Sequence, residues 1–243
     1  MIRAFIFDLD GTLVETEMLK AKAYAAVSKE LLGLGRPDQR AIDVYRRIVG
    51  STDETAARTM MEELGLRSKL PGNTEDKWRA LSALQAERYR TEFATGEGLR
   101  SVAYPQTIDL LNSQSAAGKL VAVATSSFTE SAQRVVSELG INSILDALIG
   151  RDQVTNGKPN PEIYLKTAEA LGVNSDEVVV VEDSVIGVEA AVRADMRCVA
   201  IASAFSFEGL RQQTILDQKW CIYDRTKIGS VVARHLLESE NPG

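Results

Sequence analysis

The sequence predicts an α/β protein built on a parallel sheet with helices on both faces, with a second, all-helical domain inserted near the N-terminus. From Ala103 onward, short apolar runs alternate with helix-like segments, a pattern typical of a parallel sheet covered by helices. Between Val14 and about Gly98, every segment is helix-like and none is typical of a strand. The 243 residues exceed the ~150 of a typical domain, which suits one domain carrying an insertion.

The expected strands are continuous apolar runs. The first covers residues 2–8, where five of seven residues are apolar, and it ends on an acid. Later runs predict strands that end at Thr125, Gly150, Glu182 and Ala202. One helix between them has clear end signals, with Asn160 as N-cap, Pro161 at the first helical position and Gly172 past the end. The expected sheet is therefore parallel and Rossmann-like, with buried strands.

The inserted domain is expected to consist of four helices. They lie around residues 17–32, 38–48, 53–64 and 74–94. Its one loop-like stretch covers residues 67–76. We therefore assign the α/β domain to residues 1–14 and 99–243, and the helical domain to residues 15–98.

Composition excludes several function classes. The net charge of −6 leaves no basic surplus to hold nucleic acid. No apolar run approaches the ~20 residues that span a bilayer, and the N-terminus has no secretory pattern, so we expect a cytoplasmic protein without a membrane partner. Cys198 and Cys221 lack metal-site spacing and are expected to be reduced, buried thiols. His235 is the only histidine, which excludes a histidine cluster and leaves it no expected catalytic role.

Polar residues follow the expected strands where a parallel sheet places its ligand site, outside the carboxyl ends. The first strand ends at Asp8 and Asp10, and the second ends at residues 125–127, which are Thr-Ser-Ser. The segment after the third strand contains Lys158, and the fourth strand ends at Glu182 and Asp183. Carboxylates without histidine or thiolate ligands favour Mg²⁺. The hydroxyls at a helix start and the lysine favour a phosphate site, so the set indicates phosphoryl transfer.

These segments resemble four motifs of the haloacid dehalogenase superfamily, in its branch with an inserted α-helical cap. They are "DLDGT" from Asp8, "ATSS" ending at Ser127, "GKPNPEIY" with Lys158, and "VVVEDSVIGVEAA" with Glu182 and Asp183. Their order is that of the superfamily, and the helical insertion falls where the cap belongs. The branch includes β-phosphoglucomutase and related sugar-phosphate phosphatases.

The resemblance implies a role for each residue. Asp8 would attack phosphorus to give an aspartyl-phosphate, and Asp10 would protonate the leaving oxygen and then activate water. Thr125, the Ser126 amide and Lys158 would hold the phosphoryl group. The implied Mg²⁺ ligands are the Asp8 carboxylate, the Asp10 backbone carbonyl and Asp183, with Glu182 ligating directly or through water.

Simpler interpretations exist for each segment. Asp8 to Gly11 could form a turn, residues 125–127 could cap a helix, Lys158 could be a solvated loop lysine, and the acids at 182 and 183 could be ordinary loop residues. The convergence of all four segments at the strand ends favours the functional interpretation.

Three functions remain open. The favoured one is a phosphatase acting on a small phosphorylated metabolite, with a sugar phosphate as the favoured class. A phosphomutase of the β-phosphoglucomutase type is the alternative, although Lys20 stands where many such relatives have a histidine and Phe128 where β-phosphoglucomutase has a lysine. A receiver-like phospho-acceptor switch is the non-enzymatic alternative, which an insertion covering the acceptor would disfavour.

The cap is also expected to move about its two links. These links are expected near residues 13–15 and 95–98, where Gly96 and Gly98 would absorb the change in backbone angles. Gly50, Ser51 and Thr52 are expected to form the cap loop that selects the substrate.

Overall fold

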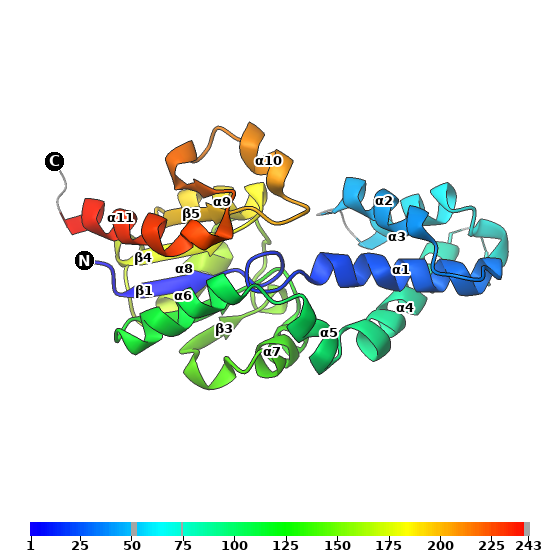
Figure 1. Cartoon of the computed structure of the whole chain (residues 1–243), viewed down its shortest axis with the longest axis horizontal. Coiled ribbons are helices and arrows are strands. Elements are labelled where there is room, and N and C mark those ends of the chain that lie inside the picture. Colours follow the sequence, from blue (N-terminus) through cyan, green and yellow to red (C-terminus); the bar gives the residue numbers. More distant parts are fainter. Residues whose placement is uncertain (50–52, 74, 241–243) are drawn as a thin grey trace. The chain divides into compact units, whose positions relative to one another are not determined.

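The computed structural model describes residues 1–49, 53–73 and 75–240, and the chain divides into two compact units (Figure 1). The α/β unit comprises Met1–Glu15 and Val102–Gly243, and the helical unit comprises Thr16–Ser101. The boundaries expected from the sequence, after residues 14 and 98, fall one and three residues earlier than these.

A six-stranded parallel sheet forms the centre of the α/β unit, in the order β3-β2-β1-β4-β5-β6. The strands are β1 (Ala4–Phe7), β2 (Leu120–Ala124), β3 (Ala147–Ile149), β4 (Val178–Glu182), β5 (Arg197–Ile201) and β6 (Cys221–Ile222). Each neighbouring pair is parallel, and the order is that of a doubly wound Rossmann sheet. The predicted fold class is therefore confirmed.

Strand β1 lies at the centre of the site-bearing part of the sheet. Its last residue, Phe7, is paired with Val123 of β2 and Val181 of β4. All residues of β1 and β4 are buried, which explains why their runs are continuously apolar. Because the three strands are parallel and in register, the residues that follow them emerge side by side at one edge.

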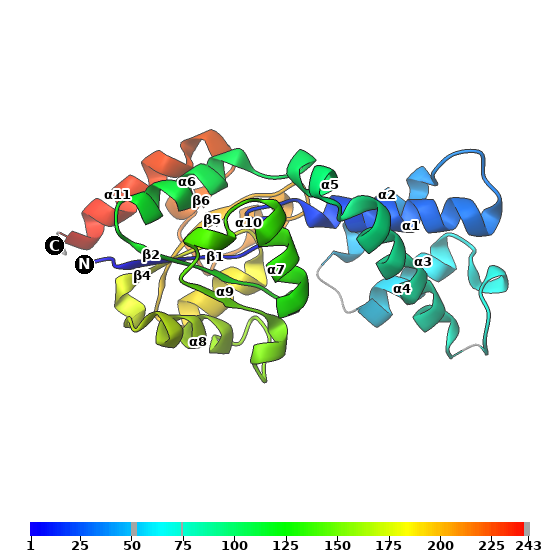
Figure 2. The same cartoon turned by 90° about the horizontal axis from the view of Figure 1, so that it is seen from below.

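Helices cover both faces of the sheet. Figure 2 shows α6 (Pro105–Ala116) and α11 (Ile228–Glu240) over one face, and α8 (Glu162–Leu171) and α9 (Val185–Arg193) over the other. The remaining helices of this unit are α7 (Thr129–Glu138) and α10 (Phe207–Gln212). Helix α8 begins one residue later than expected, but the Asn160 side chain still accepts the Glu162 N–H at 3.0 Å. Gly172 ends α8 in the left-handed region, at φ 64°, as predicted.

The helical unit contains all four predicted helices and a fifth. They are α1 (Thr16–Leu32), α2 (Gln39–Ile48), α3 (Asp53–Glu63), α4 (Lys77–Arg88) with a π-helical continuation over Tyr89–Phe93, and α5 (Gly96–Ser101). Their core includes Met60, Met61 and Leu81, which are fully buried. Several basic residues of this unit form ion pairs, among them Lys20 with Glu17 at 2.6 Å.

The structure revises the expected position of one link to the cap. Gly96 and Gly98 belong to α5, and a Cβ at Gly98 would overlap the Phe93 carbonyl, so this segment is a packed helix rather than a link. The chain crosses between the units at Glu15–Thr16, next to the first expected link, and at Ser101–Val102, after α5. The expected substrate-selecting loop, Gly50 to Thr52, lies outside the described residues.

Two further expectations concern the thiols and the membrane. Both cysteines are free, and Cys198 is buried as expected, but Cys221 is half-buried because it lies in the edge strand β6. No helix among the described residues combines the length and the apolar character needed to cross a bilayer.

Candidate active site

Three buried carboxylates meet where β1 and β4 end. Asp8 follows β1, Glu182 is the last residue of β4, and Asp183 follows it. Each can offer one carboxylate oxygen, and these three atoms lie within 4.8 Å of one another. The parallel register of β1 and β4 produces this meeting, since Asp8 N–H donates to the Val181 carbonyl at 2.9 Å. We refer to Asp8, Glu182 and Asp183 as the acid cluster.

Lys158 reaches the acid cluster from the segment before α8. Its Nζ lies 2.6 Å from Asp8 Oδ1 and 2.6 Å from Glu182 Oε1, and it also donates to the Ala124 carbonyl at 3.3 Å. The Lys158 side chain is only 2% exposed, so it is not the solvated loop lysine of the simpler interpretation. It is a buried cation held between two carboxylates and the carboxyl end of β2.

Both oxygens of Glu182 accept hydrogen bonds from the protein. Oε1 accepts from Lys158 and from the Tyr164 hydroxyl at 3.2 Å, and Oε2 accepts from the Ser184 N–H at 2.6 Å and hydroxyl at 3.0 Å. The side chain of Glu182 is therefore fixed in orientation. Its carboxylate holds Lys158 next to Asp8.

Asp10 faces the hydroxyl cluster at the end of β2. Its Oδ2 accepts from Ser127 Oγ at 2.7 Å and from Thr125 Oγ1 at 3.3 Å. Thr125 is fully buried, and its Oγ1 also accepts the Ser127 N–H at 3.0 Å. Ser126 between them is exposed. The structure thus brings Asp10, Thr125 and Ser127 together, in a more open position than the acid cluster.

The acid cluster is short of positive charge. Burial raises the pKa of Asp8 to about 8; Lys158 opposes this rise, whereas the Glu182 and Asp10 carboxylates add to it. Burial, followed by the Glu182 and Asp8 carboxylates, also raises the pKa of Asp183 well above its ordinary value. Burial by itself lowers the pKa of Lys158, but the Asp8 and Glu182 carboxylates outweigh it and keep the lysine charged.

This charge imbalance fits a divalent cation. Three carboxylates against one lysine leave an excess of negative charge that only protons or a cation can neutralise in a buried site. Carboxylate oxygens are hard ligands of the kind that Mg²⁺ takes, and the cluster contains no histidine or thiolate. The donor set therefore suits Mg²⁺.

Two glycines make room for these acids. A Cβ at Gly11, where φ is +87°, would overlap the Asp183 carboxylate, and a Cβ at Gly187 in α9 would overlap the Glu182 carboxylate. Both backbone segments therefore contact the acid cluster directly, which only glycine permits.

Replacing Gly187 with alanine is expected to destabilise the protein by about 1–3 kcal/mol, the usual cost of overpacking. A Gly-to-Ala change inside a helix normally stabilises by up to about 1 kcal/mol, so the predicted sign is the reverse of helix propensity. Gly229 in α11 is the matched control, because a Cβ there meets nothing within 4 Å. Urea denaturation should give Gly187→Ala a lower free energy of unfolding than wild type, and Gly229→Ala an equal or higher one. If both variants change the free energy of unfolding equally, the close packing at Gly187 is contradicted.

Sequence reasoning did not assign several residues that contact these groups. Ser127 was grouped with the phosphate hydroxyls, yet its Oγ donates to Asp10. Ser203 and Ser206, whose side chains lower the pKa of Asp183 against the effect of burial, follow β5 and could have been found by the same strand-end rule. Tyr164 carried no such signal, because its place in α8 is also that of an ordinary core aromatic.

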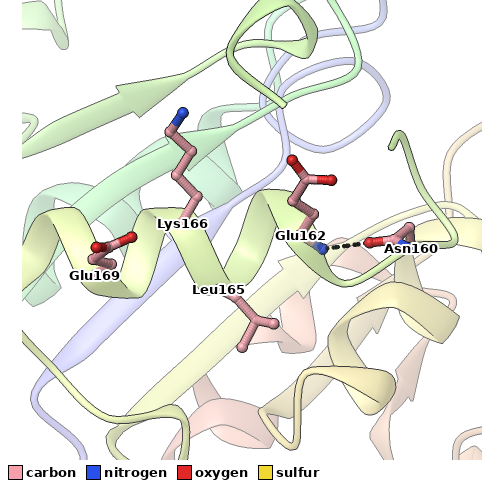
Figure 3. Close-up of a pocket in the computed structure, with 5 residues that line it drawn as sticks. All are labelled: Asn160, Glu162, Leu165, Lys166 and Glu169. Carbon is pink, nitrogen blue, oxygen red and sulfur yellow. Dashed lines mark hydrogen bonds between the residues drawn. The ribbon is translucent and has the colours of Figure 1, made fainter. Parts of the chain in front are cut away.

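A separate surface pocket lies along α8. Figure 3 shows the residues that line it, which are Asn160, Glu162, Leu165, Lys166 and Glu169. Two of its charged side chains have local partners: Glu162 accepts the N–H groups of Thr155 and Asn156, and Lys166 donates to the Gln153 carbonyl. None of the lining residues belongs to the acid cluster, and we assign this pocket no role in the chemistry.

Comparisons with known proteins agree with the geometry. A family model for haloacid dehalogenase-like hydrolases matches residues 2–195. A phosphorylated carbohydrates phosphatase of Thermotoga maritima is 34% identical over 201 residues, covering 79% of this chain and 82% of that protein.

Two solved structures are similar over nearly the full length. A Thermotoga maritima protein provisionally described as a β-phosphoglucomutase has a TM-score of 0.72 and 28% identity, covering 96% of this chain and 99% of that one. A variant of CbbY from Rhodobacter sphaeroides, in complex with xylulose-1,5-bisphosphate, has a TM-score of 0.68 and 25% identity, covering 94% and 97%. The family model spans most of the chain, and the acid cluster lies at the ends of its strands. This chain therefore belongs to the haloacid dehalogenase-like hydrolases.

Proposed function

We propose that this hydrolase is a Mg²⁺-dependent phosphatase that cleaves a small phosphorylated metabolite, with a sugar phosphate as the substrate class. The observation that carries the proposal is the pairing of Asp8 with Lys158 inside the acid cluster. Asp10, two residues further along the chain, accepts hydrogen bonds from the hydroxyls of Thr125 and Ser127. The Asp8 carboxylate is thus placed beside a cation, while the Asp10 carboxylate contacts these hydroxyls and Asp10 is less buried than Asp8. The names of the phosphorylated carbohydrates phosphatase and the xylulose-1,5-bisphosphate complex support the substrate class.

The reaction would proceed in two steps on the chain's own residues. Asp8 Oδ attacks phosphorus, the bond from phosphorus to the leaving oxygen breaks, and Asp10 gives its proton to that oxygen. Asp10, now a carboxylate, takes a proton from water, which attacks the aspartyl-phosphate and releases phosphate and Asp8. Lys158 and Thr125 would hold the phosphoryl oxygens, together with the N–H of Ser126.

The remaining charge on the phosphoryl group calls for a cation. Asp8, Asp183 and the Asp10 backbone carbonyl would hold Mg²⁺, with Glu182 ligating directly or through water. Bound there, Mg²⁺ would neutralise charge that develops on the phosphoryl oxygens. Glu182 already accepts hydrogen bonds at both oxygens, which favours the water-mediated contact.

Mg²⁺ affinity is expected to rise as pH increases towards about 8. Asp8, with its pKa raised to about 8, is protonated below that pH, and a ligand must lose its proton to bind. Each displaced proton makes the affinity up to about tenfold stronger per pH unit. Calorimetric titration with MgCl₂ at several pH values, in buffers of different ionisation heat, measures both effects. Binding that is independent of pH would contradict the shifted carboxyl group.

A phosphomutase is the second candidate, favoured by the 28% identity with the protein described as a β-phosphoglucomutase. Against it stands Phe128, at the position where the resemblance to β-phosphoglucomutase implies a lysine; the Phe128 side chain is 64% exposed and directly follows Ser127. Lys20 is paired with Glu17 within α1.

The test is a screen of purified protein against a panel of phosphorylated metabolites with MgCl₂. For β-glucose 1-phosphate, both released phosphate and the 6-phosphate isomer are measured. Steady release of phosphate from a sugar phosphate supports the proposal, and isomerisation with little release would replace it with the mutase. A single phosphorylation without turnover would indicate the receiver-like switch.

A further inference from the structure

Arg225 connects the C-terminal part of the chain to the loop that carries Asp10. Its guanidinium donates to the Gly11 carbonyl, to the Thr12 carbonyl at 3.0 Å, to Thr107 Oγ1 at 3.1 Å and, through Nε, to the Ala202 carbonyl at 3.2 Å. Gly11 and Thr12 directly follow Asp10, and they lie more than 200 residues from Arg225 in the sequence. An arginine therefore holds two consecutive carbonyls of this loop from a distant segment.

The loop that Arg225 holds is a tight turn with little room to shift. Gly11 N–H donates to the Val14 carbonyl at 2.8 Å, and Leu13 N–H donates to the Leu9 carbonyl at 2.9 Å. The Cα of Gly11 packs against the Asp183 carboxylate. Gly11 thus contacts the acid cluster at its Cα and Arg225 at its carbonyl, so a change at Arg225 acts on the backbone next to Asp10.

Tyr104 holds the guanidinium in place and contacts the same loop. The guanidinium carbon of Arg225 lies 3.3 Å from the centroid of the Tyr104 ring, which indicates a stacked cation–π contact. The Tyr104 N–H donates to the Leu13 carbonyl at 2.9 Å, and its hydroxyl donates to Glu15. Arg225 therefore combines a planar stack with a fork of donors, a geometry that lysine cannot reproduce.

We propose that Arg225 is a positioning residue for the active site. It fixes the backbone at Asp10 and Gly11, and this backbone in turn orients the Asp10 carbonyl and carboxylate. The expected change in kcat rests on the proposed phosphatase function, whereas the contacts of Arg225 with the backbone do not depend on that function. Removing a residue that orients a metal ligand or catalytic group through a hydrogen bond typically lowers metal affinity or activity by about 10- to 100-fold. Small displacements of reacting groups have effects of similar size.

The experiment compares Arg225→Met and Arg225→Lys with wild type, in kcat and KM for p-nitrophenyl phosphate and in Mg²⁺ affinity by calorimetry. Arg225→Met is expected to lower kcat or Mg²⁺ affinity by about 10- to 100-fold, with KM little changed. Arg225→Lys, whose compact ammonium keeps the charge but lacks the planar fork and the stack on Tyr104, should fall between Arg225→Met and wild type.

Lys119→Met is the matched control for a merely structural role. Lys119 also donates to a backbone carbonyl next to β1, that of Ile2, but at the opposite end of the strand. It should lower the melting temperature without changing kcat or Mg²⁺ affinity. The proposal is overturned if the Arg225 variants behave like Lys119→Met, losing stability only. Should Arg225→Met fail to fold, Arg225→Lys decides: wild-type kcat and Mg²⁺ affinity overturn the proposal, and a loss in either supports it.

Failure of the proposed function would be visible separately. A wild-type protein that hydrolyses no phosphate ester contradicts the phosphatase, and the comparison then uses Mg²⁺ affinity alone. Weaker Mg²⁺ binding by Arg225→Met, with Lys119→Met unchanged, supports the positioning role in that case, and equal binding overturns it.

Discussion

Replacing Asp8 with asparagine is expected to lower kcat by at least about 10⁴-fold, because an amide is not an effective nucleophile. The fold should persist, since the asparagine oxygen can still accept the Lys158 hydrogen bond that Asp8 Oδ1 accepts at 2.6 Å. The change also removes a charge that is costly to bury, as the raised pKa of Asp8 indicates. Without Mg²⁺, the melting temperature should therefore equal or exceed that of wild type.

The measurement pairs turnover of p-nitrophenyl phosphate with thermal denaturation. Asp146→Asn is the matched control, because Asp146 accepts the Val121 N–H at 2.8 Å near the start of β2, away from the strand ends that carry the site. It should retain kcat. MgCl₂ is expected to raise the melting temperature of the wild type, and Asp8→Asn should lose this increase. Retained turnover in Asp8→Asn would remove Asp8 as the nucleophile.

Replacing Asp10 with asparagine is expected to lower kcat by about 10²- to 10⁴-fold, the usual contribution of a positioned acid or base. Mg²⁺ binding should persist, because the proposed ligand from this residue is the backbone carbonyl. The Ser127 hydroxyl, 2.7 Å from Asp10 Oδ2, can donate to the asparagine oxygen, so the side chain should keep its place. Only the capacity to transfer a proton is lost.

The leaving group separates this effect from a general loss of structure. A sugar alkoxide needs a proton more than p-nitrophenolate does, so Asp10→Asn should reduce sugar-phosphate turnover more than aryl phosphate turnover. Water attack should be slowed with both substrates, so phosphorylated enzyme should accumulate and be detectable by mass spectrometry of the intact protein. Weaker Mg²⁺ binding, with an unchanged rate per bound metal, would instead make the Asp10 carboxylate a ligand.

The order of elements could be predicted because each carries a local signal. Continuous apolar runs such as residues 178–181, four valines in succession, are buried on both faces of a parallel sheet and are recognisable without any tertiary contact. Gly172 marked a helix end because its left-handed φ is accessible to glycine at little cost. The link assigned to Gly96 and Gly98 was wrong because the same residue type also permits close packing, here against Phe93.

The candidate site followed from one topological rule. Parallel strands end at the same edge, so residues after separate apolar runs could be grouped before their distances were known. That rule predicted the neighbourhood of Asp8, Lys158 and Asp183, which lie up to 175 residues apart in the sequence. It did not predict which carboxylate pairs with the lysine, since strand ends specify an edge but not the orientation of a side chain.

The sequence by itself therefore determined the fold class, the helical insertion and the set of residues at the strand ends, because hydrophobic period and chain order are local properties. Only the tertiary structure decided that Lys158 lies between Asp8 and Glu182, while Asp10 faces the hydroxyls of Thr125 and Ser127. It alone revealed Arg225 on the Gly11 and Thr12 carbonyls. Such contacts join side chains to backbone atoms far away in the chain, and they form only when packing brings the partners within hydrogen-bonding distance.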